Sequence, residues 1–149
     1  ALGWTSPGDW LVLDGNATWQ DFRNVSDSGG FASFSGQRIP NRPYLQANGT
    51  ARLQARDVFS TGDELSLTWH VRYLHAFFRG WESAGQLDSK QVIASQLLHS
   101  PALSQVSRRA GVSLGWTVDV QNVTNAPAFD FFGVQRPGRS VFAKLLVEH

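Results

Sequence analysis

The sequence contains neither cysteine nor methionine in its 149 residues. Without cysteine the chain can form no disulfide framework and can use no thiolate as a nucleophile or metal ligand. Because position 1 is not methionine, we expect Ala1 to follow a processing site or a longer upstream sequence. The opening segment ALGWTSPGDW has no basic stretch and no apolar core, so we do not expect a signal peptide within it.

The chain also lacks a strong net charge and a long apolar run. Thirteen Lys and Arg oppose twelve Asp and Glu, which gives a formal net charge of +1. This balance argues against a protein that binds nucleic acid or an anionic membrane through bulk charge. There is no run of about 18 apolar residues, so we expect no transmembrane helix. The absence of such a run does not exclude a membrane β-barrel, because the strands of these barrels are only half apolar.

The sequence does contain alternation of apolar and polar residues, which is the period of a β-strand. The clearest run is 45–56, where Leu, Ala and Gly alternate with Gln, Asn, Thr and Arg. No segment shows helical periodicity over about ten residues. In the run 92–106 the phase is ambiguous, and Pro101 predicts a bulge or a sheet edge. The sequence therefore predicts six antiparallel, up-and-down strands, at 11–22, 45–56, 65–78, 92–106, 112–121 and 141–147.

The connections between these strands alternate long and short, as in outer-membrane barrels with short periplasmic turns and long extracellular loops. Aromatic residues gather near the strand ends and resemble two interfacial girdles, whereas Trp69 and Trp116 lie in mid-strand. The pattern favours an all-β fold whose strands form part of a transmembrane β-barrel wall. The expected girdles are Trp10 and Phe59 near the short turns, and Trp19, Phe22, Tyr44, Tyr73, Phe77, Phe78 and Phe142 near the long loops.

Two other architectures fit the same alternation. One is a soluble all-β binding module, such as a lectin-like sandwich, with a dry core on its apolar face and carbohydrate in its loops. The other is a small self-closed barrel that acts as an anchor or adhesin. That barrel would pair the first strand, around Leu11 to Trp19, with the last, around Val141 to Val147.

Several stretches resemble the C-terminal end of a TonB-dependent outer-membrane receptor, and their order and spacing carry the resemblance over essentially the whole chain. Barrels of this family have about 22 strands and a preceding plug domain. Residues 1–149 would therefore be a C-terminal part without the plug and the earlier strands. The stretches are 36–44 (GQRIPNRPY) at the entry to a strand, Ser95-Gln96 and His99 in the strand third from the end, 119–125 (DVQNVTN) in the penultimate strand, and 132–144 (FGVQRPGRSVFAK) in the last loop and strand.

The resemblance implies a receptor and transporter of the Gram-negative outer membrane that takes up a scarce ligand, such as a ferric siderophore, with energy supplied through TonB. Its partners would be outer-membrane lipid, the missing plug and barrel segment, TonB through that plug, and a small-molecule ligand, but no nucleic acid. Binding and gated passage make no bonds, so we expect neither an enzyme nor a cofactor. The extracellular loops would be 24–43, 79–91 and 122–138.

Basic and aromatic residues in these loops are the candidates for ligand binding. A guanidinium fork suits the oxygens of an anionic chelate. In the alternative interpretation the arginines, together with the nearby prolines, pin the loop ends to the barrel rim. The candidates are Arg38, Arg42, Tyr44, Trp81, Arg136 and Arg139.

Polar strand positions are the candidates for the lumen. They would either form charge pairs with the plug or line a solvated channel, and the sequence leaves both open. His70 and His75 differ by an odd offset along one strand and so point to opposite faces, and we expect no metal site. No segment resembles the nucleophile elbow of a hydrolase. The lumen- or plug-facing candidates are Arg52, Arg56, His70, Arg72 and Lys144.

Overall fold

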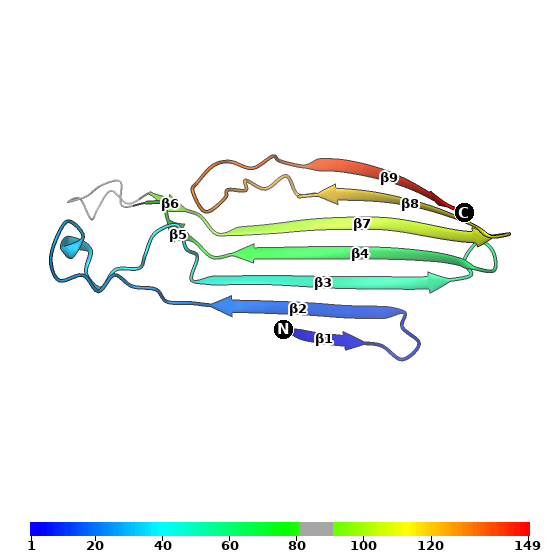
Figure 1. Ribbon diagram of the computed structural model, residues 1–149, viewed down its shortest axis with the longest axis horizontal. Coiled ribbons are helices and arrows are strands. Elements are labelled where there is room, and N and C mark those ends of the chain that lie inside the picture. The colour runs from blue at the N-terminus through cyan, green and yellow to red at the C-terminus, as the bar shows by residue number, and fades with distance from the viewer. Residues whose placement is uncertain (81–90) are drawn as a thin grey trace.

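The computed structural model describes residues 1–80 and 91–149, and Figure 1 shows their arrangement. Within these residues the regular structure is β-sheet with one turn of 3₁₀ helix, so the predicted all-β class is confirmed. The helical turn is η1 (Ala32–Phe34), and the strands are β1 (Leu2–Thr5), β2 (Leu11–Trp19), β3 (Leu45–Arg56), β4 (Asp63–Leu74), β5 (Phe77–Phe78), β6 (Val92–Ile93), β7 (Gln96–Arg109), β8 (Val112–Gln121) and β9 (Ser140–Glu148).

Seven strands form one antiparallel sheet in the order β1-β2-β3-β4-β7-β8-β9. Apart from the separate β5–β6 pair, each strand pairs with the next one along the chain, as the up-and-down prediction requires. Figure 1 shows the long connections after β2, β4 and β8 at one end of the sheet and the short turns at the other. The β7–β8 turn is the tightest, because Ala110 and Gly111 both have positive φ, which suits a two-residue hairpin.

Pairing in register brings the apolar positions of all strands to one side, which we call the apolar face. In one row Leu13 pairs with Ala51, Ala51 with Trp69, and Trp69 with Pro101. The opposite side is the polar face. One of its rows runs through Asp14, Thr50, His70 and Ser100.

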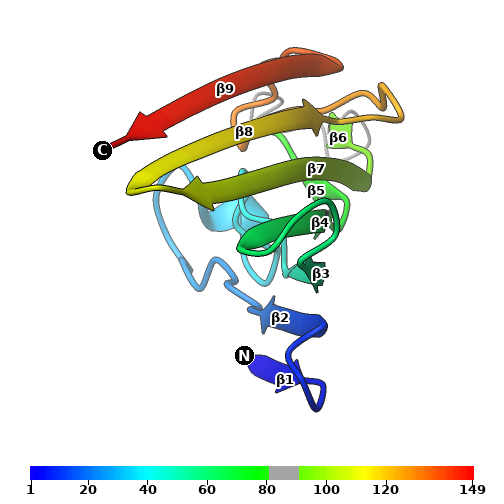
Figure 2. The same ribbon diagram turned by 90° about the vertical axis from the view of Figure 1, so that its right-hand side faces the viewer.

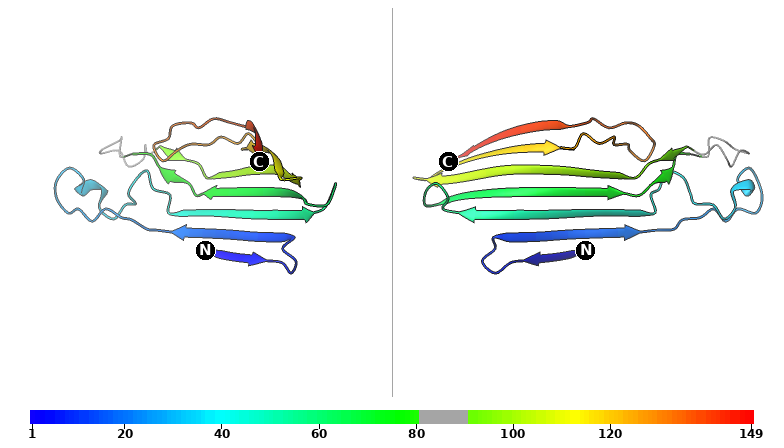
Figure 3. Two further views of the ribbon diagram at one scale, coloured as in Figure 1. Left: turned by 45° about the vertical axis from the view of Figure 1, so that its right-hand side comes forward. Right: turned by 180° about the vertical axis from the view of Figure 1, so that it is seen from behind.

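The sheet is a single curved layer, as the view along the strands in Figure 2 and the side views in Figure 3 show. No described segment covers the apolar face, where Leu53 is 44% exposed and Leu145 69% exposed. The few buried apolar residues lie instead among the long loops and the strand ends next to them. They are Phe34, Leu74, Phe77, Ile93 and Ala128.

The accessible surface reflects this missing second layer. The chain exposes 9956 Å², whereas a compact monomer of its mass exposes about 7,500 Å². The difference is about a third of the expected surface, and much of the exposed area is apolar side chain on the sheet. Within the described residues, no helix has the length and apolar character to span a membrane.

Each of the two mid-strand tryptophans is hydrogen-bonded to a polar side chain on the apolar face. The indole N–H of Trp69 donates to Nδ1 of His99 over 3.2 Å. The indole N–H of Trp116 donates to Oε1 of Gln105 over 2.9 Å. His99 and Gln105 both belong to β7, and they are the reason that the phase of this strand was ambiguous in the sequence.

Several predicted strand bounds were wrong. β1 was not predicted, because residues 2–5 alternate too briefly. The predicted strand 65–78 ends at Leu74, and β5 belongs to a separate sheet. The predicted strand 92–106 is divided into β6 and a longer β7. Pro101 causes no bulge beside β4, but the pairing of β7 with β8 begins only at Ala102.

The aromatic residues predicted to form girdles do not all lie on the apolar face. Trp19 and Tyr73 lie on the apolar face near the long loops, at opposite positions from Leu45 and Ala47. Phe142 pairs with Asp119 and therefore lies on the polar face. Phe77 is buried at 5% exposure and contacts the ring of Phe131, so neither phenylalanine belongs to an outward girdle.

The expected closure of a small self-closed barrel is wrong for the described residues. β1 and β9 are the two edges of the sheet, and no pairing joins either β1 or β2 to β9. β9 is exposed along eight of its nine residues. The sheet is thus open at both edges.

Candidate functional site

The polar face of the sheet is a candidate site, and short polar side chains dominate it. Hydrogen bonds run across the strands between the Asn48 and Asn16 side chains (3.1 Å), the Thr50 hydroxyl and Nδ1 of His70 (3.0 Å), and the hydroxyls of Ser66 and Ser104 (2.8 Å). These pairs order the face without using its charged groups.

The predicted lumen residues all lie on this polar face. Arg52 pairs with Val12 and Thr68, Arg72 with Asn48 and Leu98. Within the described part of the chain none of the predicted lumen cations has an ion-pair partner. Their charges are therefore available to an incoming group. The set consists of Arg52, Arg56, Arg72 and Lys144, with His70 as the fifth predicted residue.

The third long loop, residues 122–139, folds back over the polar face from a fixed base at Asn122. This asparagine is 5% exposed, and its side chain bonds both the N–H and the carbonyl of Ala126. Its own N–H donates to the hydroxyl of Ser100 on β7. Further along, the N–H of Phe129 donates to Oε1 of the buried Gln96 over 2.8 Å.

The middle of this loop is a miniature hairpin that carries Arg136. Phe129 and Gln135 form a β-bridge, and the N–H of Arg136 donates to the carbonyl of Ala128 over 2.8 Å. The tip is closed by Asp130, whose Oδ1 accepts the N–H groups of Phe132 and Val134. The backbone of Arg136 is therefore fixed against the sheet, although its side chain is exposed.

A cavity of about 430 Å³ lies between the polar face and this hairpin, and we call it the polar-face cavity. Strands β3, β4, β7 and β8 form its floor, and loop residues 136–138 form its other side. Its volume is within the usual range for small-molecule sites. The polar and charged groups that line it are Asn48, Thr50, His70, Arg72, Ser100, Asp119, Gln121, Asn122, Arg136 and Ser140.

Sequence reasoning placed His70 and Arg72 in the lumen and Arg136 in a ligand-binding loop, but it did not bring them together. It did not name Asp119 and Gln121 as site residues, although strand alternation put both on the polar side, in the phase of Thr117 and Lys144. The return of the loop over the sheet had no signal in the sequence.

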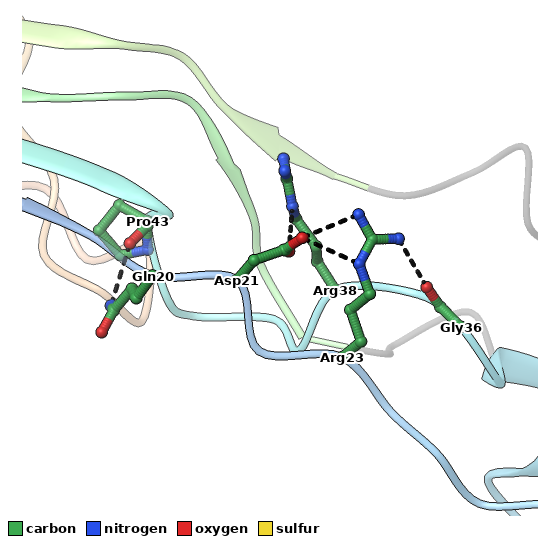
Figure 4. Close-up of polar contacts among 6 residues, drawn as sticks. All are labelled: Gln20, Asp21, Arg23, Gly36, Arg38 and Pro43. Atoms are coloured by element: carbon green, nitrogen blue, oxygen red, sulfur yellow. Dashed lines mark hydrogen bonds and ion pairs between the residues drawn. The ribbon is translucent and has the colours of Figure 1, made fainter.

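The first long loop is organised by one carboxylate, as Figure 4 shows. Asp21 accepts the Nε–H of Arg38 over 2.8 Å and the Nε–H of Arg23 over 3.0 Å. Arg23 also donates to the carbonyl of Gly36. We call Asp21, Arg23 and Arg38 the Asp21 clamp, and it joins the two ends of a loop whose middle carries η1.

The clamp changes the titration of its carboxyl group. Hydrogen bonding by Arg38, and then by Arg23, holds the pKa of Asp21 below its ordinary value, although partial burial acts in the opposite direction. The guanidinium of Arg38 also lies 4.0 Å from the centre of the Tyr44 ring. Arg38 is thus held by both an anion and an aromatic face.

Among the loop arginines, Arg38 has the contacts that the structural interpretation expects, and its role in ligand binding stays a prediction. Arg38 and Tyr44 are in contact and tie the loop to the start of β3, which matches the structural interpretation. Arg42 lies over the Phe22 ring at 5.6 Å. Arg139 is exposed, and its backbone N–H bonds the Asn125 side chain. Trp81 lies outside the described residues.

The long loops are also joined to one another. The N–H of Asn41 donates to the carbonyl of Phe78, and its side chain accepts the N–H of Gly80. The ring of Phe77 contacts that of Phe131 in the third loop. A second hollow of about 470 Å³ lies where the first and third loops meet, lined by Gln20, Pro40, Asn41, Arg42, Pro43, Gln46, Phe131 and Phe132.

The histidines have separate surroundings. His70 bonds Thr50 on the polar face, His99 bonds Trp69 on the apolar face, and His75 accepts or donates a hydrogen bond at Tyr73. Among the described residues no three His, Cys, Asp or Glu side chains are grouped to hold a metal ion. Comparisons with protein-family models, curated proteins and solved structures find no match to this chain.

Proposed function

We propose that this chain is part of the wall of a transmembrane β-barrel in the outer membrane of a Gram-negative bacterium. We further propose that the barrel is a TonB-dependent receptor that takes up a scarce ligand such as a ferric siderophore. The membrane part of the proposal is supported by the fold. The receptor part is supported by the resemblance of the loop and strand sequences.

The observation that carries the proposal is the uncovered apolar face of a one-layer sheet. A soluble protein buries such a face against a second layer, whereas a barrel wall turns it toward lipid. The strands β2, β3, β4, β7, β8 and β9 have 9 to 14 residues. A transmembrane β-strand needs about 9–11 residues.

The tryptophan pairs support the same proposal. An indole N–H in hydrocarbon has no water to bond, and leaving it unpaired costs several kcal/mol in that medium (about 4–8 on the cyclohexane scale). On the apolar face, the indole N–H groups of Trp69 and Trp116 both donate hydrogen bonds to side chains of the neighbouring strand β7. The charged strand residues lie on the polar face, except at the short-turn ends, where Asp63 and Arg109 are found.

In this proposal the polar face lines the lumen and meets the plug, and the joined long loops face the exterior and contribute to ligand capture. Outer-membrane lipid covers the apolar face. Another part of the barrel pairs with the open edges. TonB acts through the plug, as the resemblance implies.

Fluorescence quenching tests the membrane assignment. The protein is reconstituted into vesicles whose lipids carry bromine on the acyl chains, and quenching is compared with unbrominated vesicles. We expect strong quenching, and the loss of most of it when Trp4, Trp69 and Trp116 are replaced by Phe, because Trp4 lies in the same row of the apolar face as Trp69. Trp10→Phe, at a short turn, is the matched control and should remove little. Absence of quenching, with a folded, monomeric chain in detergent-free buffer, would instead support the soluble binding module.

Uptake of radioactive iron tests the receptor assignment. A Gram-negative strain that makes the complete protein is compared with a strain from which its gene is deleted, over a panel of ferric siderophores, with and without a protonophore. We expect energy-dependent uptake of at least one chelate to fall on deletion. Unchanged uptake across the panel would contradict iron uptake without contradicting the barrel wall.

A further inference from the structure

We propose that the polar-face cavity binds a hydroxylated carboxylate, with Arg72 and Arg136 holding the carboxylate and the surrounding amides and hydroxyls holding the hydroxyl groups. The proposal goes beyond the receptor assignment and rests on the cavity itself. It assigns a ligand class to a place where a strand residue and a loop residue meet.

The charges in the cavity favour an anion. Arg72 and Arg136 contribute two positive charges, and Asp119 contributes one negative charge. Neither arginine has an ion-pair partner within the described residues. A guanidinium presents a planar fork of donors that fits two carboxylate oxygens, and its positive charge persists at any pH near neutrality.

The cavity is also preorganised, because both arginines come from fixed backbone. Arg72 lies in β4, which is paired on both sides. Arg136 lies on the miniature hairpin that Gln96 and Asp130 hold in place. Gly138 completes this side, since a Cβ at that position would meet the Asn125 side chain at 2.5 Å.

The remaining lining groups specify what accompanies the carboxylate. Thr50, Ser100 and Ser140 offer hydroxyls, and the side chains of Asn48 and Gln121 offer amides. Each of these groups can both donate and accept a hydrogen bond, as a ligand hydroxyl does. Asn48, Thr50, Ser100 and Ser140 each already form one hydrogen bond within the chain, and an apolar anion would leave their remaining donors and acceptors unused. A sugar acid or an open-chain hydroxy acid would pair with them.

Calorimetric titration tests the proposal, with the protein in detergent micelles and with galacturonate, gluconate and galactose as probes. Galactose has the ring and hydroxyls of galacturonate but no carboxylate. We expect galacturonate or gluconate to bind with a dissociation constant of about 1 mM, and galactose to bind at least about tenfold more weakly. The better acid identifies the cavity as a site for a ring or an open-chain hydroxy acid.

Matched arginine variants locate the binding. Arg72→Gln and Arg136→Gln should each weaken binding of the acid by about tenfold to a hundredfold. Arg56→Gln removes a charge from the same polar face near the short-turn end, outside the cavity, and should leave binding within about twofold. Because Arg136 is an exposed loop residue, its variant carries the test even where Arg72→Gln fails to fold.

Three results would overturn the proposal: no binding of either acid, equal binding of galactose and galacturonate, or equal weakening by all three variants. The assay needs neither transport nor a bilayer. The carboxylate site can therefore fail while the quenching and uptake results stand, and it can hold while they fail.

Discussion

Single side chains in this protein are most informative where one group organises a long segment. Asp21 is such a group, since its two carboxylate oxygens receive the Nε–H groups of Arg38 and Arg23 across the first long loop. Sequence reasoning named Arg38 as a ligand-binding candidate because a guanidinium fork suits the oxygens of an anionic chelate. Its partner Asp21 is 17 residues away, and only the folded loop brings it near.

Replacement of Asp21 by Asn should release both arginines. An amide accepts a weaker hydrogen bond than a carboxylate and carries no charge. In nuclear magnetic resonance spectra at pH 7 we expect the Nε–H signals of Arg23 and Arg38 to exchange slowly with water in the parent protein and at least about tenfold faster in Asp21→Asn. Asp27→Asn, an exposed change in the same loop, is the control. Unaltered signals in Asp21→Asn would contradict the clamp.

The same signals should depend on pH in one direction. Because the clamp lowers the pKa of Asp21, the stabilisation that the ionised carboxylate gives the loop is fully present above its ordinary pKa, near 4. It is lost as the pH falls through the lowered value. We expect both Nε–H signals to persist from pH 7 to about pH 4 and to disappear only below it. Loss between pH 7 and pH 5 would contradict this assignment.

At the scale of strands, alternation was a reliable guide wherever each face had one chemical character. It located β3 and β8 to within about one residue, because neither strand puts a large apolar group on the polar face. It failed in β7, where His99 and Gln105 lie on the apolar face and accept hydrogen bonds from tryptophans of other strands. These polar side chains lie on the apolar face because they bond tryptophans of neighbouring strands. The periodicity of a single strand contains no information about such contacts.

The candidate site was predictable to the same extent. Strand parity put Arg52, Arg72 and Lys144 on one face, as the structure has them. The cavity was not predictable, because it needs Asn122 and Gln96 to hold a loop back over the sheet. Those contacts join segments whose separation in sequence has no fixed period.

Arginine substitutions at two neighbouring β7 residues test whether the apolar and polar faces have different surroundings. In lipid vesicles, Leu103→Arg should lower the free energy of unfolding by about 2–4 kcal/mol, since it places a cation in the hydrocarbon layer. Ala102→Arg, one residue away on the polar face, should change it by less than about 1 kcal/mol. Equilibrium denaturation in urea measures both. Equal effects of the two substitutions would argue against a lipid-facing apolar face.

At the scale of the whole molecule, the defining property is an open sheet. Its interior strands β4 and β7 are hydrogen-bonded on two sides, whereas β1 and β9 are bonded on one. An unpaired strand edge readily accepts another strand. In the proposed barrel that strand comes from the remaining wall.

Hydrogen exchange measures this difference. In the 149-residue chain in micelles, we expect amides of β9 to exchange at least about tenfold faster than those of β4. In the complete protein, the proposed barrel predicts that β9 becomes as protected as its neighbour β8, because a further strand would then pair with its free edge. Slow exchange of β9 in the isolated chain, or fast exchange in the complete protein, would each count against the barrel wall.

If the sheet is part of the proposed barrel wall, the tryptophan pairs also affect how its strands are aligned during assembly in a membrane. A shift of one residue between β7 and β8 is rejected by the alternation itself, because it turns Asp119 toward lipid. A shift of two residues keeps every face correct, so alternation cannot detect it. In the direction that sets Trp116 opposite Leu103 instead of Gln105, however, this shift would leave the indole N–H without a hydrogen-bond acceptor in hydrocarbon. In water that error costs little, because solvent satisfies the indole. The misaligned β7–β8 pairing becomes unfavourable only as the hairpin enters the bilayer. Insertion into the membrane would therefore select the correct alignment of these two strands.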